Sequence, residues 1–107
     1  SCCFLMACTT IDYTNHIEGW PELTVDVKVV SFEKMSEECA KYGGFMQVPL
    51  ACSEYFLDDL ICKVWVTSGN GWAERHEVGH CEGYDHPGSD ELRDIYSNWK
   101  KNHEQIK

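Results

Sequence analysis

Residues 60–67 read Leu-Ile-Cys-Lys-Val-Trp-Val-Thr, and this run of β-branched and aromatic side chains predicts the clearest strand of the chain. Ser-Gly-Asn-Gly follows at residues 68–71 and is typical of a turn. A helix is expected from about residue 72 to residue 82, and Gly83 is placed to end it. A strand that turns directly into a helix indicates that strands and helices are mixed along the chain.

The segments before this stretch contribute further elements. Residues 23–32 alternate in part between apolar and polar side chains, which predicts a strand with one solvated face. A short helix is expected over residues 33–42. Residues 45–55 show a mixed pattern, because Pro49 would interrupt a central strand.

A C-terminal helix is expected from about residue 89 to residue 103. Ser89 is a favourable N-cap, and acidic residues in the first turn suit the positive end of the helix. Four apolar residues recur at helical spacing on one face, namely Leu92, Ile95, Tyr96 and Trp99. The sequence therefore predicts an α+β domain with a small, mostly antiparallel sheet, a helix over about 72–82 and a C-terminal amphipathic helix.

Length and charge narrow the range of functions. The chain has 107 residues, which is enough for one domain with one core. It carries 9 Lys and Arg residues against 18 Asp and Glu residues, so its formal net charge is -9. A surface of this charge repels phosphate backbones, so we expect no nucleic-acid partner.

Seven cysteines are a high and odd number for this length, and no two of them have the CxxC spacing of common zinc or redox motifs. The chain opens without a methionine, and its first residues end in Leu5-Met6-Ala7-Cys8. This ending resembles the lipobox of bacterial lipoproteins, in which the signal peptide is removed before a cysteine whose thiol is acylated. The resemblance implies that residues 1–8 are the remainder of a signal peptide ending at the lipidated Cys8, and that residues 9–107 form the domain. A buried N-terminal strand is the alternative.

Four cysteines remain after that segment, at positions 39, 52, 62 and 81. An even number suits disulfides, and four cysteines allow three connectivities. We expect Cys39 to pair with Cys52 and Cys62 with Cys81, because these pairs close short loops; ordinary buried thiols are the alternative. Disulfides in so small a domain favour an oxidising compartment.

Residues 76–86 read His-Glu-Val-Gly-His-Cys-Glu-Gly-Tyr-Asp-His and contain three of the five histidines. On a helix, His76 and His80 lie one turn apart on the same face and can reach one metal ion together. Glu77 is rotated by about 100° from His76, so it can act on water beside the ion without ligating it. Gly83 can adopt the left-handed conformation that ends the helix, and His86 can then complete a three-histidine site.

The pattern HExxHxxGxxH resembles the signature of the metzincin clan of zinc metallopeptidases. The resemblance implies a zincin-like fold and a zinc ion held by His76, His80 and His86. It also implies that Glu77 is the general base, and that an antiparallel edge strand before the helix binds extended peptide. Residues 60–67 are the candidate for that strand.

Two further features bear on this resemblance. Tyr84 and Tyr96 are candidate oxyanion donors. The clan has a methionine-containing turn after the third histidine, whereas all three methionines of this chain precede His86.

Two other interpretations remain open. The ending Gly83-Tyr84-Asp85-His86 is also similar to the HGxxHxxGYDH motif of the YbeY-type endoribonucleases, which bind metal through three histidines. That family has glycine at the position of Glu77 and acts on RNA. The third interpretation is a non-catalytic envelope lipoprotein with a structural or degenerate metal site, for which Asp85 or Cys81 would be the fourth ligand.

Of the three, we expect a zinc-dependent metallopeptidase that hydrolyses peptide or other amide bonds in a peptide or protein substrate. The expected location is the periplasmic side of a bacterial cell envelope, where a monomer is held by its lipid anchor; secretion is the alternative.

Overall fold

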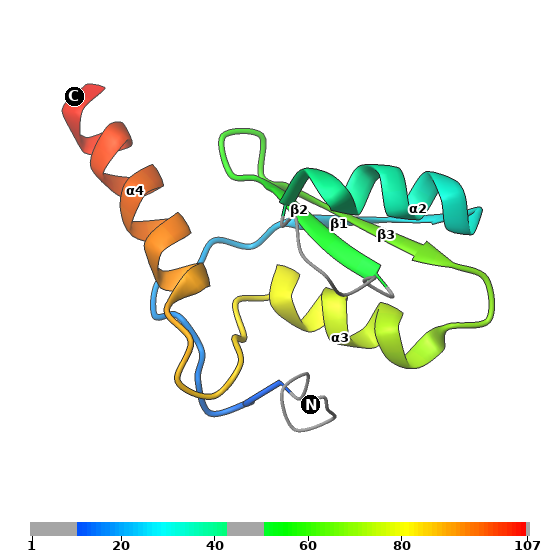
Figure 1. Cartoon of the computed structure of the whole chain (residues 1–107). Coiled ribbons are helices and arrows are strands. Elements are labelled where there is room, and N and C mark those ends of the chain that lie inside the picture. Colours follow the sequence, from blue (N-terminus) through cyan, green and yellow to red (C-terminus); the bar gives the residue numbers. More distant parts are fainter. Residues whose placement is uncertain (1–10, 43–50, 107) are drawn as a thin grey trace.

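The computed structural model describes residues 11–42 and 51–106 of the chain. The elements follow in the order β1 (Thr24–Val30), α2 (Phe32–Cys39), a 3-10 turn (Ala40–Tyr42), β2 (Ala51–Phe56), β3 (Ile61–Thr67), α3 (Gly71–Cys81) and α4 (Glu91–Ile106). Figure 1 shows strands and helices mixed along the chain. The expected α+β class is therefore confirmed, and the strand predicted at residues 60–67 and the helix predicted at 72–82 are found as β3 and α3.

The three strands form one mixed sheet in the order β1-β3-β2. β3 is parallel to β1 and antiparallel to β2. The expectation of a mostly antiparallel sheet is thus only half correct. The reason lies in the connections: α2 separates β1 from β2 in the chain, whereas β2 and β3 form a hairpin that must be antiparallel.

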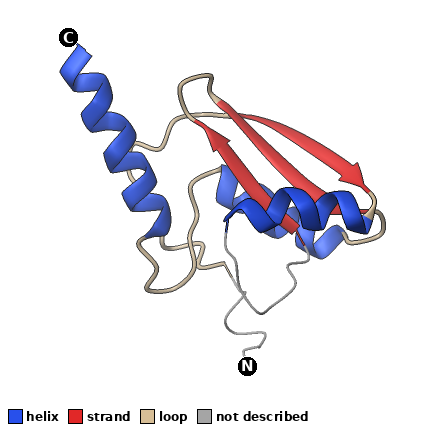
Figure 2. Cartoon of the chain, turned by 45° about the horizontal axis from the view of Figure 1, so that its top comes forward, coloured by secondary structure: helices blue, strands red, loops and turns tan. Residues whose placement is uncertain are grey.

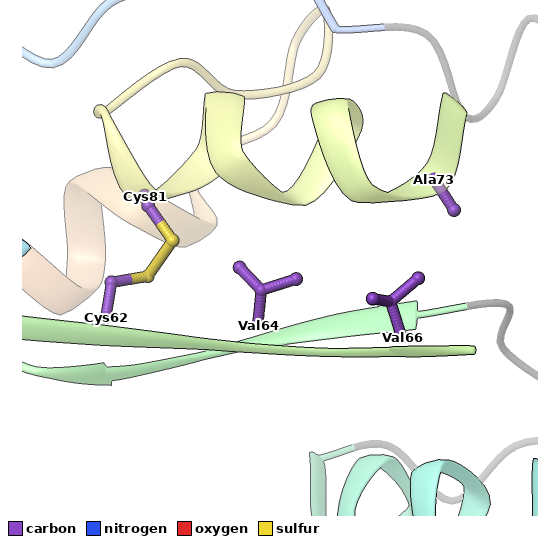
Figure 3. Packing of buried hydrophobic residues seen from close by; sticks show 5 residues of the cluster. All are labelled: Cys62, Val64, Val66, Ala73 and Cys81. Atoms are coloured by element: carbon purple, nitrogen blue, oxygen red, sulfur yellow. A yellow bond between two sulfur atoms is a disulfide. The ribbon is translucent and has the colours of Figure 1, made fainter. Parts of the chain in front are cut away.

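β3 lies in the middle of the sheet, so the prediction that residues 60–67 form an edge strand is wrong. Its alternate residues Cys62, Val64 and Val66 are at most 1% exposed. Figure 3 shows these side chains directed at α3, where they meet Ala73 and Cys81. The edges of the sheet are β1 and β2.

The sheet has a helix on each face (Figure 2). α3 covers the face that carries the core residues of β3. α2 covers the other face, where Lys34 lies 5.9 Å from the centre of the Trp65 ring, and Met35 is buried at 1% exposure. One cluster of buried residues therefore lies between α3 and the sheet, and Met35 of α2 is buried as well.

Each of these two helices is joined to the sheet by a disulfide. Cys39 at the end of α2 is bonded to Cys52 in β2, and Cys81 at the end of α3 is bonded to Cys62 in β3. These are the expected pairings, which are thereby confirmed. The bonded cysteines are 13 and 19 residues apart, so each bond contributes about 3 kcal/mol by constraining the unfolded chain. The disulfides indicate an oxidising location.

α4 lies to one side of the sheet in Figure 1, next to the segment that precedes β1. The helix begins at Glu91, two residues after the predicted start, and the Ser89 hydroxyl accepts a hydrogen bond from the Glu91 N–H (3.2 Å). Leu92 is only 2% exposed, and the other residues of the predicted apolar face are half-buried. The Tyr96 ring packs against Trp20 of the N-terminal segment, with the ring centroids 6.3 Å apart.

Candidate metal centre

The three histidines of the motif come together around the C-terminal end of α3. His76 and His80 lie one turn apart on this helix. Gly83 follows the helix with a φ of 98°, a left-handed conformation that favours glycine. A Cβ at this position would lie 2.7 Å from Cγ of Trp20, so a larger residue would have to displace the indole. The turn brings His86 back beside His80, as predicted.

The three imidazole rings direct their nitrogens at one another. Nε2 of His80 lies 3.1 Å from Nε2 of His76 and 3.2 Å from Nε2 of His86. The three ligand atoms all lie within 4.8 Å of one another. Two imidazole nitrogens bound to one tetrahedral zinc ion at about 2.0–2.1 Å are roughly 3.3–3.4 Å apart. This group could therefore hold a metal ion.

The contact of Nδ1, the other ring nitrogen of His80, determines the tautomer of the neutral ring. Nδ1 lies 2.7 Å from the carbonyl oxygen of Tyr84, which can only accept, so Nδ1 donates and the lone pair is on Nε2. Burial lowers the pKa of His80. Burial, together with the neighbouring His80 and His86, lowers the pKa of His76 to about 4. His76 and His80 are therefore neutral near pH 7, as metal binding requires.

Glu77 lies next to this cluster but does not belong to the group that could ligate the ion. Its Oε1 accepts a hydrogen bond of 2.7 Å from the Ser53 hydroxyl in β2. Burial raises the pKa of Glu77 to about 7; the Ser53 hydrogen bond opposes this rise, and the charge of Glu91 adds to it. A carboxyl group that titrates near pH 7 can both accept and release a proton during a reaction.

A pocket of about 190 Å³ opens beside the histidines. Its walls come from β2, α3, the loop after α3 and the start of α4, and consist of Ala51, Cys52, Ser53, Tyr55, Glu77, His80, His86, Glu91 and Leu92. The space is enough for several water molecules, since one water occupies about 30 Å³ in the liquid. The Glu77 carboxylate, His80 and His86 therefore line the same pocket, which has room for water.

Tyr55 is a pocket residue that the sequence analysis did not single out. It is two residues from Ser53 on the same face of β2, and its ring packs edge to face against Trp20 with the centroids 5.9 Å apart. Burial, and next the charge of Glu77, raise the pKa of its phenol well above 10. The phenol is thus a neutral O–H donor near pH 7. The alternation of Ala51, Ser53 and Tyr55 was the signal that could have identified it.

The structure places the two tyrosines predicted as oxyanion donors away from the pocket lining. The Tyr84 ring packs against Tyr13 and His16, with centroid distances of 5.1 and 4.7 Å. Tyr96 lies on α4 against Trp20. Neither of these two tyrosines lines the pocket with Glu77, whereas Tyr55 does.

Both residues considered as a fourth ligand are engaged elsewhere. Cys81 is bonded to Cys62. The carboxylate of Asp85 accepts hydrogen bonds from the backbone N–H groups of His86 (2.7 Å) and Leu92 (3.1 Å). Within the described part of the chain, the group therefore offers three protein ligands. This number is typical of catalytic zinc sites, in which the fourth position takes water or substrate.

No known protein family, curated protein or solved structure matches the chain. Among residues 11–42 and 51–106, no helix has both the length and the apolar character of a membrane span. Cys8, the predicted site of acylation, lies outside the described residues.

Proposed function

We propose that this protein is a zinc-dependent hydrolase that cleaves peptide or other amide bonds. The observation that carries the proposal is the convergence of three histidine Nε2 atoms beside a buried carboxylate that is not a ligand. The pocket on the open side of this cluster supports a catalytic role, since a purely structural site usually has four protein ligands and no need of such a space.

The residues of the cluster suit zinc in number and kind. Three imidazole nitrogens are a common donor set for this ion, and their neutrality leaves it the full positive charge. When bound, zinc polarises a carbonyl group and lowers the pKa of water to about 7. The carbonyl of Tyr84 contributes by holding His80 in the tautomer that presents Nε2.

Glu77 is the general base of the proposed reaction. Its Oε1 is held by the Ser53 hydroxyl, which leaves Oε2 to accept the proton of the attacking water. The same carboxyl group can then give that proton to the leaving amine. Tyr55, from the facing strand, donates its phenolic O–H toward the carbonyl oxygen of the substrate as negative charge develops there.

A nucleic-acid substrate is less well supported than a peptide. The acidic residues that line the pocket are Glu77 and Glu91, and the lining includes no lysine or arginine. Such a surface repels phosphate groups. The peptide substrate is therefore the better candidate.

We also propose that the domain is attached to a membrane on the periplasmic side of a bacterial cell envelope through acylated Cys8. The lipobox-like residues 5–8 and the two disulfides support this location. Mass spectrometry of the N-terminal peptide from a membrane fraction should find a lipid-modified cysteine. An unmodified thiol in protein recovered from the medium would favour secretion instead.

The first test of the proposed function is metal content. Protein purified from an oxidising compartment should contain one zinc ion per chain, and His86→Ala should lose most of it. His103→Ala is the matched control, because His103 is exposed on α4 and lies outside the cluster. An absence of bound metal in the unaltered protein, even after zinc is added, would refute the proposal.

The second test separates catalysis from binding. Glu77→Gln should keep the zinc and lower the hydrolysis of a mixed peptide library by about 10²–10⁴-fold, the usual contribution of a general base. Unchanged turnover in this variant would show that Glu77 is not the base.

A further inference from the structure

Asp85 is only 1% exposed although its side chain is ionisable. Oδ1 accepts the backbone N–H of His86 at 2.7 Å, and Oδ2 accepts the N–H of Leu92 at 3.1 Å. A carboxylate is costly to bury unless it is hydrogen-bonded, and N–H bonds to a charged carboxylate are among the stronger ones. One side chain therefore joins the third histidine of the cluster to the first turn of α4.

The same loop is held from its other side by the N-terminal segment. The Asp85 N–H donates to the carbonyl of Asn15 (3.1 Å), and the Asp12 N–H donates to the carbonyl of Asp85 (3.0 Å). Nδ2 of Asn15 donates to the carbonyl of His86 at 2.9 Å. Both polar groups of the His86 backbone are thus bonded to side chains of other residues.

We propose that Asp85 is a positioning residue that, together with Asn15, holds His86 in register with His76 and His80. In this role it sets the affinity of the cluster for metal and links metal binding to the docking of α4. The inference rests on the proposed metal binding by the three histidines. It extends that proposal to residues that do not themselves ligate the ion.

The physical reason is that the three ligands are held by different means. His76 and His80 belong to α3, which is fixed by its own hydrogen bonds and by the Cys62–Cys81 disulfide. His86 lies in a loop, so its position depends on the contacts of its backbone. Without them, His86 would have to be ordered when the ion binds. Groups that orient a ligand in this way typically change metal affinity by about 10–100-fold.

The linkage is reciprocal. If an ordered first turn of α4 favours metal binding, bound metal must favour that ordered turn to the same extent. Hydrogen exchange at the Leu92 amide measures the order of this turn directly, because the Leu92 N–H is bonded to Asp85. Zinc should therefore slow hydrogen exchange at Leu92.

The test compares Asp85→Asn with the unaltered protein. Asparagine has nearly the same shape, but its NH₂ group cannot accept the second backbone N–H. We expect the dissociation constant for Zn²⁺, measured by competition with a chromophoric chelator, to rise about 10–100-fold. The visible spectrum of bound Co²⁺ should change, and zinc should no longer slow exchange at Leu92. The matched control is Asp59→Asn, an exposed acid in the turn between β2 and β3, which should leave all three measurements unaltered.

A dissociation constant within twofold of that of the unaltered protein, with an unchanged Co²⁺ spectrum, would overturn the inference. If the unaltered protein itself bound no zinc, the proposed function would fail as well, and His86→Ala would then make no difference. Should Asp85→Asn not fold, Asn15→Ala removes the amide donor to the His86 carbonyl without adding a charge and should still weaken zinc binding several-fold. Unchanged affinity in that variant would likewise overturn the inference.

Discussion

Replacing Gly83 by alanine tests how the turn after α3 is held. Gly83 has a φ of 98°, and a Cβ there would lie 2.7 Å from Cγ and 2.9 Å from Cβ of Trp20. The indole is not free to move away, because its Nε1 donates to the carbonyl of Cys81 at 2.8 Å and its ring packs against Tyr55. The substitution therefore combines a disfavoured backbone conformation with a steric conflict in a well-packed contact.

The two costs can be separated by a second glycine. Gly88 has a similar φ of 74°, but a Cβ there would meet nothing within 4 Å. Gly88→Ala should lower the free energy of unfolding by about 1–2 kcal/mol, the cost of a left-handed conformation. Gly83→Ala should lower the free energy of unfolding by this amount and by about 1–3 kcal/mol more, because Trp20 would have to be displaced. The total of about 2–5 kcal/mol is a large part of the stability of a small domain.

The assay is denaturant unfolding in chelator with both disulfides intact, followed by tryptophan fluorescence and circular dichroism. Zinc affinity should also fall for Gly83→Ala, because the turn places His86. Equal losses of stability for the two variants would refute the reasoning, since they would show that Trp20 makes room at no cost.

Three further predictions follow from the site. Tyr55→Phe should retain the zinc and lower peptide hydrolysis by about 10²–10³-fold, the typical effect of losing one oxyanion donor; an unchanged rate would exclude the phenol from that role. In chelator, Glu77→Gln should become more stable than the unaltered protein as the pH rises from about 4.5 to about 7, because burial raises the pKa of Glu77 and the folded state then disfavours its ionised form. Parallel curves of stability against pH for the two proteins would contradict this. Removal of metal by chelator should leave the far-ultraviolet circular dichroism unchanged, since the buried cluster around Val64 and both disulfides do not involve the histidines; a cooperative loss of helix signal would favour a structural ion instead.

The histidine cluster could be predicted because its geometry is local. The spacing of His76 and His80 is set by the period of one helix, and His86 follows after a turn that Gly83 permits. The disulfide pairings also follow from short separations along the chain. For such features, the spacing of the residues along the chain determines most of the geometry.

The strand order could not be predicted in the same way. The pattern of residues 60–67 predicts a strand but does not tell whether it lies at the edge or in the middle of the sheet. Only the path of the chain through α2 places these residues between β1 and β2. That Tyr55 lines the pocket could not be predicted for a related reason. Tyr55 reaches the site from a strand far from the motif in sequence, and the facing of β2 toward α3 depends on that sheet order.

The way the three histidines are held bears on the kind of metal site that they could form. In small domains that fold only around an ion, the ion itself brings the ligands together, and four protein ligands give the greatest folding energy. Here α3 is fixed by the core and by the Cys62–Cys81 disulfide, and the backbone of His86 is bonded to Asp85 and Asn15. The three nitrogens therefore converge through contacts that do not need the ion. A fold that already holds three ligands can leave the fourth position to water, and two disulfides of about 3 kcal/mol each give a chain of this size the stability to do so.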